Sequence, residues 1–197
     1  MNDWTAFVLA VLGLLATPGP TNTLMAASGA QRGVRNSLHL LAGELGGYAI
    51  AITVWIEIVG AVAAREPMVA TVAKLVAAAF LYWSAWKLWR TAGTADLGQR
   101  GITLSRVFVT TLLNPKALVF AFAIFPQLGS VERLPYDAVF ALLVIATAIG
   151  WMILGALAQR GSAGLLTSAR VEQITAMALT VFATVLMVQT LQSLSWD

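Results

Sequence analysis

Six long apolar blocks constrain this 197-residue chain more than any other feature of its sequence. A helix needs roughly 20 apolar residues to cross the hydrocarbon core of a bilayer. Lipid leaves only helices and closed barrels as spanning structures, and the blocks lack the period-two alternation of barrel strands. The sequence therefore predicts an all-α membrane protein with six transmembrane helices. We expect these helices at Trp4–Ser28, Leu38–Ala64, Met68–Trp89, Arg106–Leu128, Tyr136–Ala158 and Ile174–Leu194.

The composition excludes a cytosolic enzyme, because 59% of the residues are hydrophobic and only 11% are charged, against about 25% charged in an average soluble domain. The chain has no cysteine and the single histidine His39, so we expect no metal, no cofactor and no thiol chemistry. The net charge of +3 comes from Lys and Arg that lie between apolar blocks. This pattern indicates the lipid bilayer as partner, and no nucleic acid. We interpret Trp4 onward as a retained span and not as a signal peptide.

The positive charges are unequally shared between the two sides of the predicted membrane domain. The connections after spans one, three and five carry eight Lys and Arg, whereas the opposite side carries two. Cytoplasmic connections hold the excess of Lys and Arg in membrane proteins. The sequence therefore predicts a multi-pass protein with both termini periplasmic or extracellular.

The chain divides into two halves of three spans each within a single membrane domain. We expect the first half at residues 1–91, a cytoplasmic linker at 92–104 and the second half at 105–197. An odd number of spans in each half makes the second half start from the opposite face. This arrangement is the sequence form of an inverted repeat, which many secondary transporters use.

Helix-breaking residues occur at matching places in the two halves. The first span contains Thr17-Pro18-Gly19-Pro20, and the fourth contains Asn114-Pro115, so that Pro18 and Pro115 are 97 positions apart. A proline inside a helix removes a backbone hydrogen bond and clashes with the preceding turn. Paired discontinuous helices indicate a transport site, and the alternative for each break is a packing kink. The sequence predicts that helices one and four are broken.

Four ionisable side chains lie inside the predicted spans, where burial is costly and usually serves function. They are Glu44, Glu57, Lys74 and Lys116. Glu57 and Lys74 are placed symmetrically about a turn, so we expect a structural ion pair between antiparallel neighbours. The alternative is that Lys74 lines an outer pathway.

Glu44 and Tyr48 share one stripe of their helix, since they are four residues apart. The stripe lies next to a small-residue face that contains Gly43 and Gly47 and suits close helix contact. Burial disfavours the charged form of a carboxylate. We hypothesise that Glu44 binds the substrate ammonium and the coupling proton alternately; the alternative is a fixed counter-ion for Lys116.

Lys116 lies close to the middle of span four and requires a partner. The candidates are a substrate carboxylate, Glu44, or a carbonyl exposed by the first break. Thr21 and Asn22 begin the second half of span one, where free amides and the helix dipole favour a carboxylate. No catalytic residue is expected. The candidate substrate-binding residues are Pro18, Gly19, Pro20, Thr21, Asn22, Glu44, Tyr48, Asn114, Pro115 and Lys116.

The motifs ATPGP at residues 16–20, NPKA at 114–117 and FPQ at 125–127 occur in that order along the chain. At these positions the sequence resembles the LysE/RhtB family of amino-acid exporters. The resemblance implies export of amino acids or related small metabolites from a bacterial cytoplasm, driven by the proton motive force. It thus implies a proton antiporter of the inner membrane.

Other functions fit the sequence less well. A divalent metal-ion exporter of similar shape would need clustered Asp, Glu, Cys or His, whereas the spans hold two separated Glu residues. An intramembrane enzyme would need a nucleophile or acid–base constellation, and a channel a continuous polar stripe. An exporter of a small amino-acid-like substrate remains the interpretation, and a homo-oligomer is compatible with it.

Overall fold

The computed structural model describes residues 3–59, 66–90, 101–126, 128–160 and 168–194, and these ranges contain helices and no strand. The all-helical prediction is confirmed for this part of the chain. Most of the expected linker, residues 92–100, and the expected end of span two lie outside the described residues. The elements in chain order are α1 (Asp3–Ala16), α2 (Pro20–Arg32), α3 (Val34–Ser37), α4 (Leu40–Val54), η1 (Trp55–Val59), α6 (Pro67–Arg90), α7 (Leu104–Leu112), α8 (Lys116–Val119), η2 (Phe120–Ile124), α9 (Ser130–Arg160) and α10 (Ser168–Leu194).

Several of these helices have the length and apolar composition of membrane spans. Leu40–Glu57 and Ser130–Gln159 each qualify as one helix, and two bent helix pairs qualify when each pair is taken together. The first pair, α1 and α2, is bent by 64°, and the second, formed by α7 with α8 and η2, is bent by 50°. The breaks therefore lie where the prolines predicted them.

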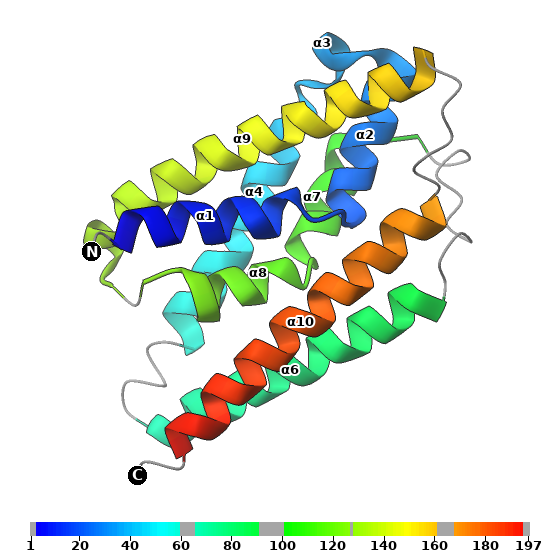
Figure 1. Cartoon of the computed structure of the whole chain (residues 1–197). Coiled ribbons are helices and arrows are strands. Elements are labelled where there is room, and N and C mark those ends of the chain that lie inside the picture. The colour runs from blue at the N-terminus through cyan, green and yellow to red at the C-terminus, as the bar shows by residue number, and fades with distance from the viewer. Residues whose placement is uncertain (1–2, 60–65, 91–100, 127, 161–167, 195–197) are drawn as a thin grey trace.

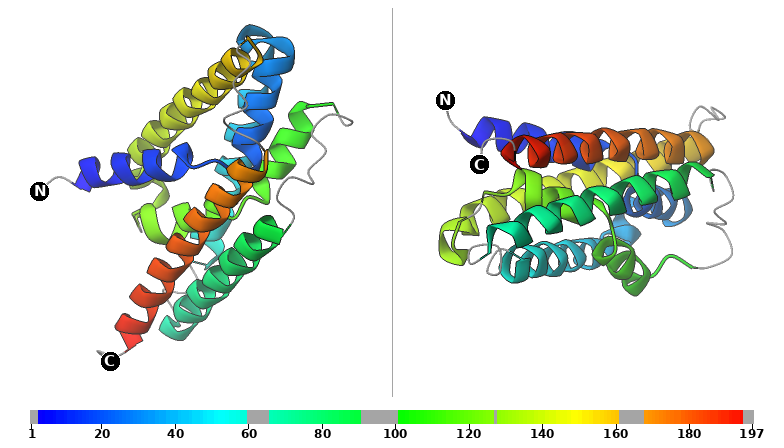
Figure 2. Two further views of the ribbon diagram at one scale, coloured as in Figure 1. Left: turned by 45° about the vertical axis from the view of Figure 1, so that its right-hand side comes forward. Right: turned by 90° about the horizontal axis from the view of Figure 1, so that it is seen from below.

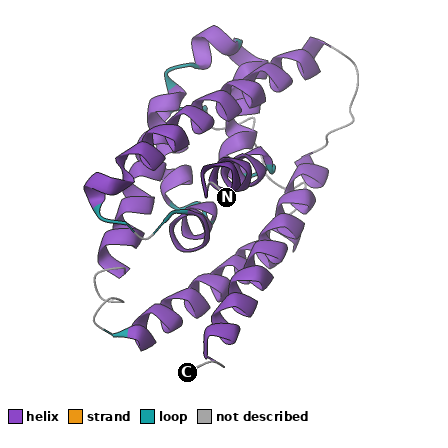
Figure 3. Ribbon diagram, turned by 60° about the vertical axis from the view of Figure 1, so that its left-hand side comes forward, coloured by secondary structure: helices purple, strands orange, loops and turns teal. Residues whose placement is uncertain are grey.

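The two bends lie together in the middle of the molecule (Figure 1). From this centre α1 and α8 run toward one side, and α2 and α7 run toward the other. The helices α6 and α10 form a separate antiparallel pair along one edge, and they lie side by side in all views (Figures 2 and 3). The start of α1 and the end of α10 are on the same side of the molecule (Figure 1).

Glycines bring α4 close to α7, as the small-residue face of α4 predicted. A Cβ atom at Gly43 would lie 2.7 Å from the carbonyl oxygen of Leu104, and one at Gly47 would lie 2.8 Å from that of Phe108. Small residues allow helix backbones to approach this closely. This close contact brings Glu44, the residue after Gly43, near the second break.

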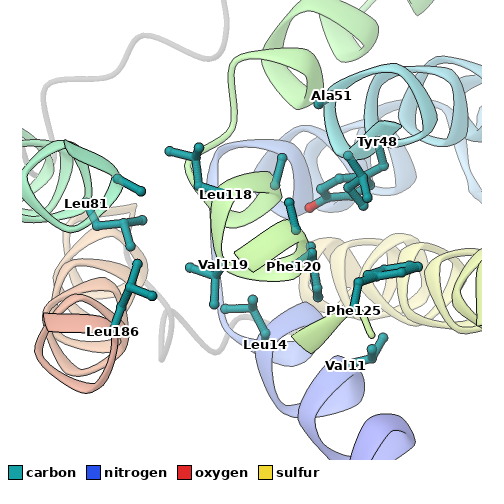
Figure 4. Packing of buried hydrophobic residues seen from close by; sticks show 14 of the residues in the cluster. Val11, Leu14, Tyr48, Ala51, Leu81, Leu118, Val119, Phe120, Phe125 and Leu186 are labelled. Atoms are coloured by element: carbon teal, nitrogen blue, oxygen red, sulfur yellow. The ribbon is translucent and has the colours of Figure 1, made fainter. Parts of the chain in front are cut away.

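An aromatic cluster fills the space between α4, η2 and α9. The rings of Tyr48, Phe120 and Phe140 contact one another edge to face, with centroids 4.8 to 5.6 Å apart. Figure 4 shows Tyr48 packed against Phe120, and Leu81 and Leu186 pointing toward α8 from the α6–α10 pair. All four residues of the short helix α8 are buried, so α8 lies inside the larger of the two hydrophobic clusters.

Candidate functional site

The first break separates α1 from α2. Gly19 has an extended backbone (φ −169°, ψ 172°), and Pro20 begins α2 at a position that needs no amide donor. The break leaves carbonyl groups at the end of α1 and directly after it without helical donors. The buried side chain of Asn22 donates to two of these carbonyls, at 2.7 Å to Leu15 and 2.9 Å to Thr17. The role of Asn22 in the structure is therefore to hold the last turn of α1.

The second break separates α7 from α8 and is capped by its own residues. The Oδ1 atom of Asn114 accepts the backbone N–H of Lys116 at 3.0 Å, and Nδ2 of Asn114 donates to the Thr21 hydroxyl at 3.2 Å. The hydroxyls of Thr21 and Thr111 are 3.1 Å apart. These buried hydrogen bonds join the second break to the first turn of α2.

The ammonium group of Lys116 reaches from the second break into the first. Its Nζ atom donates to the carbonyl oxygen of Thr17 at 2.5 Å, and the residue is only 2% exposed. A Cβ atom at Gly19 would lie 3.2 Å from both Cε and Nζ of Lys116, so glycine leaves room for the ammonium group there. Of the three partners expected for Lys116, the structure shows a backbone carbonyl at the first break.

Glu44 is buried on α4 and is 1% exposed. Its carboxylate interacts electrostatically with Lys116 and with Tyr48. Within the described part of the chain, its Oε2 atom has no hydrogen-bond partner. Buried polar groups in native proteins are nearly always hydrogen-bonded, and an exception indicates strain or function. Oε2 can take up a proton or accept a hydrogen bond from a bound molecule.

A cavity of about 210 Å³ lies between the breaks and the α6–α10 pair. Four of the expected substrate-binding residues line it, namely Pro20, Asn114, Pro115 and Lys116. Glu44 and Tyr48 are not among its lining residues, whereas Lys116, with which Glu44 interacts electrostatically, is. Among the described residues, the lining consists of Pro20, Phe80, Trp83, Ser84, Lys87, Leu88, Leu113, Asn114, Pro115, Lys116 and Leu179.

The wall that α6 contributes to this cavity was not predicted from the sequence. Trp83 and Lys87 are one turn apart near the C-terminal end of α6, and the tryptophans there indicate an interfacial aromatic belt. Nothing in the sequence of α6 says which neighbour it faces. The wall exists because α6 packs against α10 beside the second break.

Glu57 has a different partner from the one the sequence suggested. Its carboxylate accepts from Nη1 of Arg133 at 3.0 Å, and Nε of Arg133 is 3.4 Å from Asp137. The sequence placed Lys74 opposite Glu57 on the assumption that consecutive spans are neighbours. In the structure α6 packs chiefly against α10, and the start of α9 supplies the cation.

Comparison with known proteins identifies the family. Residues 12–190 match the family described as LysE type translocator. The chain belongs to this family. Members of the LysE family are transporters and not enzymes, in agreement with a site that combines broken helices with a cavity.

LysE-family relatives with curated names are similar over most of the chain. A homoserine/homoserine lactone efflux protein of Salmonella typhimurium is 29% identical over 76% of this chain and 75% of its own length. A cysteine/O-acetylserine efflux protein of Salmonella choleraesuis is 26% identical over 80% of this chain and 82% of its own. An uncharacterized membrane protein of Vibrio cholerae is 30% identical, over 64% of this chain and 65% of its own length. No solved structure gives a significant match.

Proposed function

We propose that this protein is a secondary active transporter that exports a small amino acid or a related metabolite from the cytoplasm by proton antiport. The observation that carries the proposal is the cavity beside two broken helices, which Lys116 lines while its ammonium group is hydrogen-bonded at the first break. Discontinuous helices in matching halves mark substrate sites in transporters. Relatives named for efflux of homoserine and homoserine lactone, and of cysteine and O-acetylserine, support a small amino-acid-like substrate.

The proposed architecture has six spans arranged as two inverted repeats of three helices. Three helix contacts support it. The third helices of the two halves, α6 and α10, pack against each other. In such a repeat α4 corresponds to α9, and α7 corresponds to α1. The contact of α4 with α7 therefore has the contact of α9 with α1 as its counterpart, and both contacts occur. A two-fold axis in the membrane plane relates such pairs in inverted-repeat transporters.

The proposed orientation places the cavity on the cytoplasmic side of a bacterial inner membrane. The lining residues of α6 run from Phe80 to Leu88, toward the end of α6 that carries Lys87 and Arg90. Connections rich in Lys and Arg are cytoplasmic, so this end faces the cytoplasm and both termini face outward. Substrate then enters the cavity from the cytoplasm, which is the compartment from which it is exported.

Lys116 is the proposed link between substrate binding and proton exchange. A substrate carboxylate in the cavity competes with the Thr17 carbonyl for the ammonium group of Lys116. Movement of this cation changes the electrostatic environment of Glu44, with which it interacts. Antiport requires substrate binding to favour loss of the proton, so we propose that Lys116 moves closer to Glu44 when it leaves the Thr17 carbonyl. Glu44 releases its proton at that step and takes one up after the substrate has left.

No observation favours the alternative of a divalent metal-ion exporter. Hard cations require several oxygen or nitrogen ligands at one place. Among the residues that the structure describes, no three His, Asp or Glu side chains come together.

Counterflow in proteoliposomes tests the proposed function. The purified full-length protein is loaded with unlabelled amino acids, and uptake of labelled homoserine, cysteine, O-acetylserine and other amino acids is measured with and without a pH gradient. We expect exchange of at least one of them and net transport that follows the gradient. Exchange of none would overturn the proposal, and transport indifferent to the gradient would overturn antiport.

The substitution Glu44→Gln tests the coupling group. It keeps the size of the buried side chain and removes the exchangeable proton, so we expect counterflow to persist while the response to the pH gradient disappears. Glu66→Gln is the matched control, because Glu66 is exposed and lies just before α6. An unchanged gradient response in Glu44→Gln would assign the coupling role elsewhere.

A further inference from the structure

The described wall of the cavity contains basic residues and no acidic ones. Its lining includes the two lysines Lys87 and Lys116, and no Asp or Glu is among the lining residues. An amino acid carries both a carboxylate and an ammonium group. Lys116 provides a partner for the carboxylate, whereas the ammonium group requires a partner of another kind.

The aromatic wall of the cavity already binds an ammonium group. The Nζ atom of Lys87 lies 5.2 Å from the ring centroid of Trp83, within the range of about 6 Å over which a ring face attracts a cation. The ring of Phe80 lies 5.7 Å from that of Trp83 and extends the same wall. Tryptophan gives the strongest cation–π interaction of the aromatic side chains.

We infer that the Trp83 ring is the binding site for the substrate ammonium group, and that Lys87 is a resident cation which the substrate displaces from it. This inference rests on the proposed function and names the chemical class of its substrate. The substrate carries a primary ammonium together with a carboxylate, so that Lys116 and Trp83 hold its two charged ends. An analogue without the amino group keeps only the contact with Lys116.

The next turn of α6 offers a matched control. Arg90 lies over the ring of Trp86, also 5.2 Å from the centroid. Trp86 does not line the cavity at the breaks; it lines a separate groove between α6 and α10. Trp86→Leu therefore removes the same kind of interaction from the same helix without touching the proposed site.

The test uses the full-length protein in proteoliposomes and the amino acid among L-homoserine, L-cysteine and O-acetyl-L-serine that it exchanges fastest. Competition by that amino acid is compared with competition by its deaminated analogue, which is 4-hydroxybutyrate, 3-mercaptopropionate or 3-acetoxypropionate. We expect the wild type to prefer the amino acid about tenfold or more, and Trp83→Leu to lose most of this preference. Trp83→Phe should keep part of it, and Trp86→Leu all of it.

Lys87→Gln provides a second, opposite readout. Because it removes the resident cation, we expect KM for the amino acid to fall severalfold while the deaminated analogue competes as before. An unchanged amino-acid preference in Trp83→Leu, or a raised KM in Lys87→Gln, would overturn the inference and leave the exporter in place. If the wild type exchanges none of the three amino acids and no other amino acid, the proposed function fails, and this inference fails with it.

Discussion

The two helix breaks differ in the source of the groups that satisfy their backbones. At the second break, the Asn114 side chain caps the amide of Lys116, and the amide of Leu113 donates to the carbonyl of Val109. Each of these bonds spans at most four residues. At the first break, the carbonyls of Leu15 and Thr17 depend on Asn22 from the next helix, and that of Thr17 also on Lys116 from the other half of the chain.

This difference assigns different mechanical roles to the two breaks. A break that is held by its own neighbours keeps its shape when a ligand arrives. A break held by a mobile ammonium group changes its hydrogen bonding when that group turns to a ligand. We therefore expect the second break to act as a fixed support, and the first break to respond to substrate. Four experiments separate these roles.

Lys116→Met should have the largest effect, because it removes the hydrogen bond that a charged group makes to the first break. A hydrogen bond to a charged group contributes about 1.5–3 kcal/mol, so we expect counterflow to fall about 10- to 100-fold. Lys74→Met is the control, since Lys74 is absent from the cavity lining. Full exchange by Lys116→Met would contradict the role of Lys116.

Asn22→Leu should unfold the last turn of α1 without touching the cavity lining. Each buried carbonyl that loses its donor costs about 1–3 kcal/mol, and Asn22 serves two of them. We expect a clear drop in the melting temperature of the detergent-solubilised protein. Asn36→Leu removes an exposed side-chain bond to a carbonyl in α2 and should leave the melting temperature nearly unchanged; equal losses would show that the first break is not specially dependent on Asn22.

Gly19→Ala should reduce transport severalfold with little loss of stability. The added methyl group would lie 3.2 Å from Cε and Nζ of Lys116 and should push the ammonium group off the Thr17 carbonyl. Gly13→Ala is the matched control in α1, because a Cβ there meets nothing within 4 Å. Both variants are compared by counterflow, and indistinguishable rates would mean that Lys116 tolerates displacement.

The hydrogen bond between Thr21 and Thr111 should give the smallest effect. A double-mutant cycle with Thr21→Val and Thr111→Val isolates the link between the breaks. We expect a coupling free energy of about 0.5–1 kcal/mol in thermal unfolding. A coupling near zero would mean that the bridge between the breaks depends on Asn114 alone.

Local features of the sequence were enough to predict the helices, the positions of both breaks and the tight face of α4. Hydropathy, the missing amide of proline and the small size of glycine act within a few residues of the chain, so their consequences can be derived without knowing the neighbours. Pro18 and Pro115 thus marked the bends, and Gly43 and Gly47 marked the contact with α7.

The partners of the charged groups were decided by the tertiary structure. The sequence left three partners open for Lys116 and suggested Lys74 for Glu57, whereas the structure brings Lys116 to Thr17 and Arg133 to Glu57. The tertiary structure also places α6 beside the breaks, so that Trp83 lines the cavity. A charged residue inside an apolar segment shows from the sequence alone that it needs a partner. Which helix supplies that partner depends on how helices distant in the chain pack together.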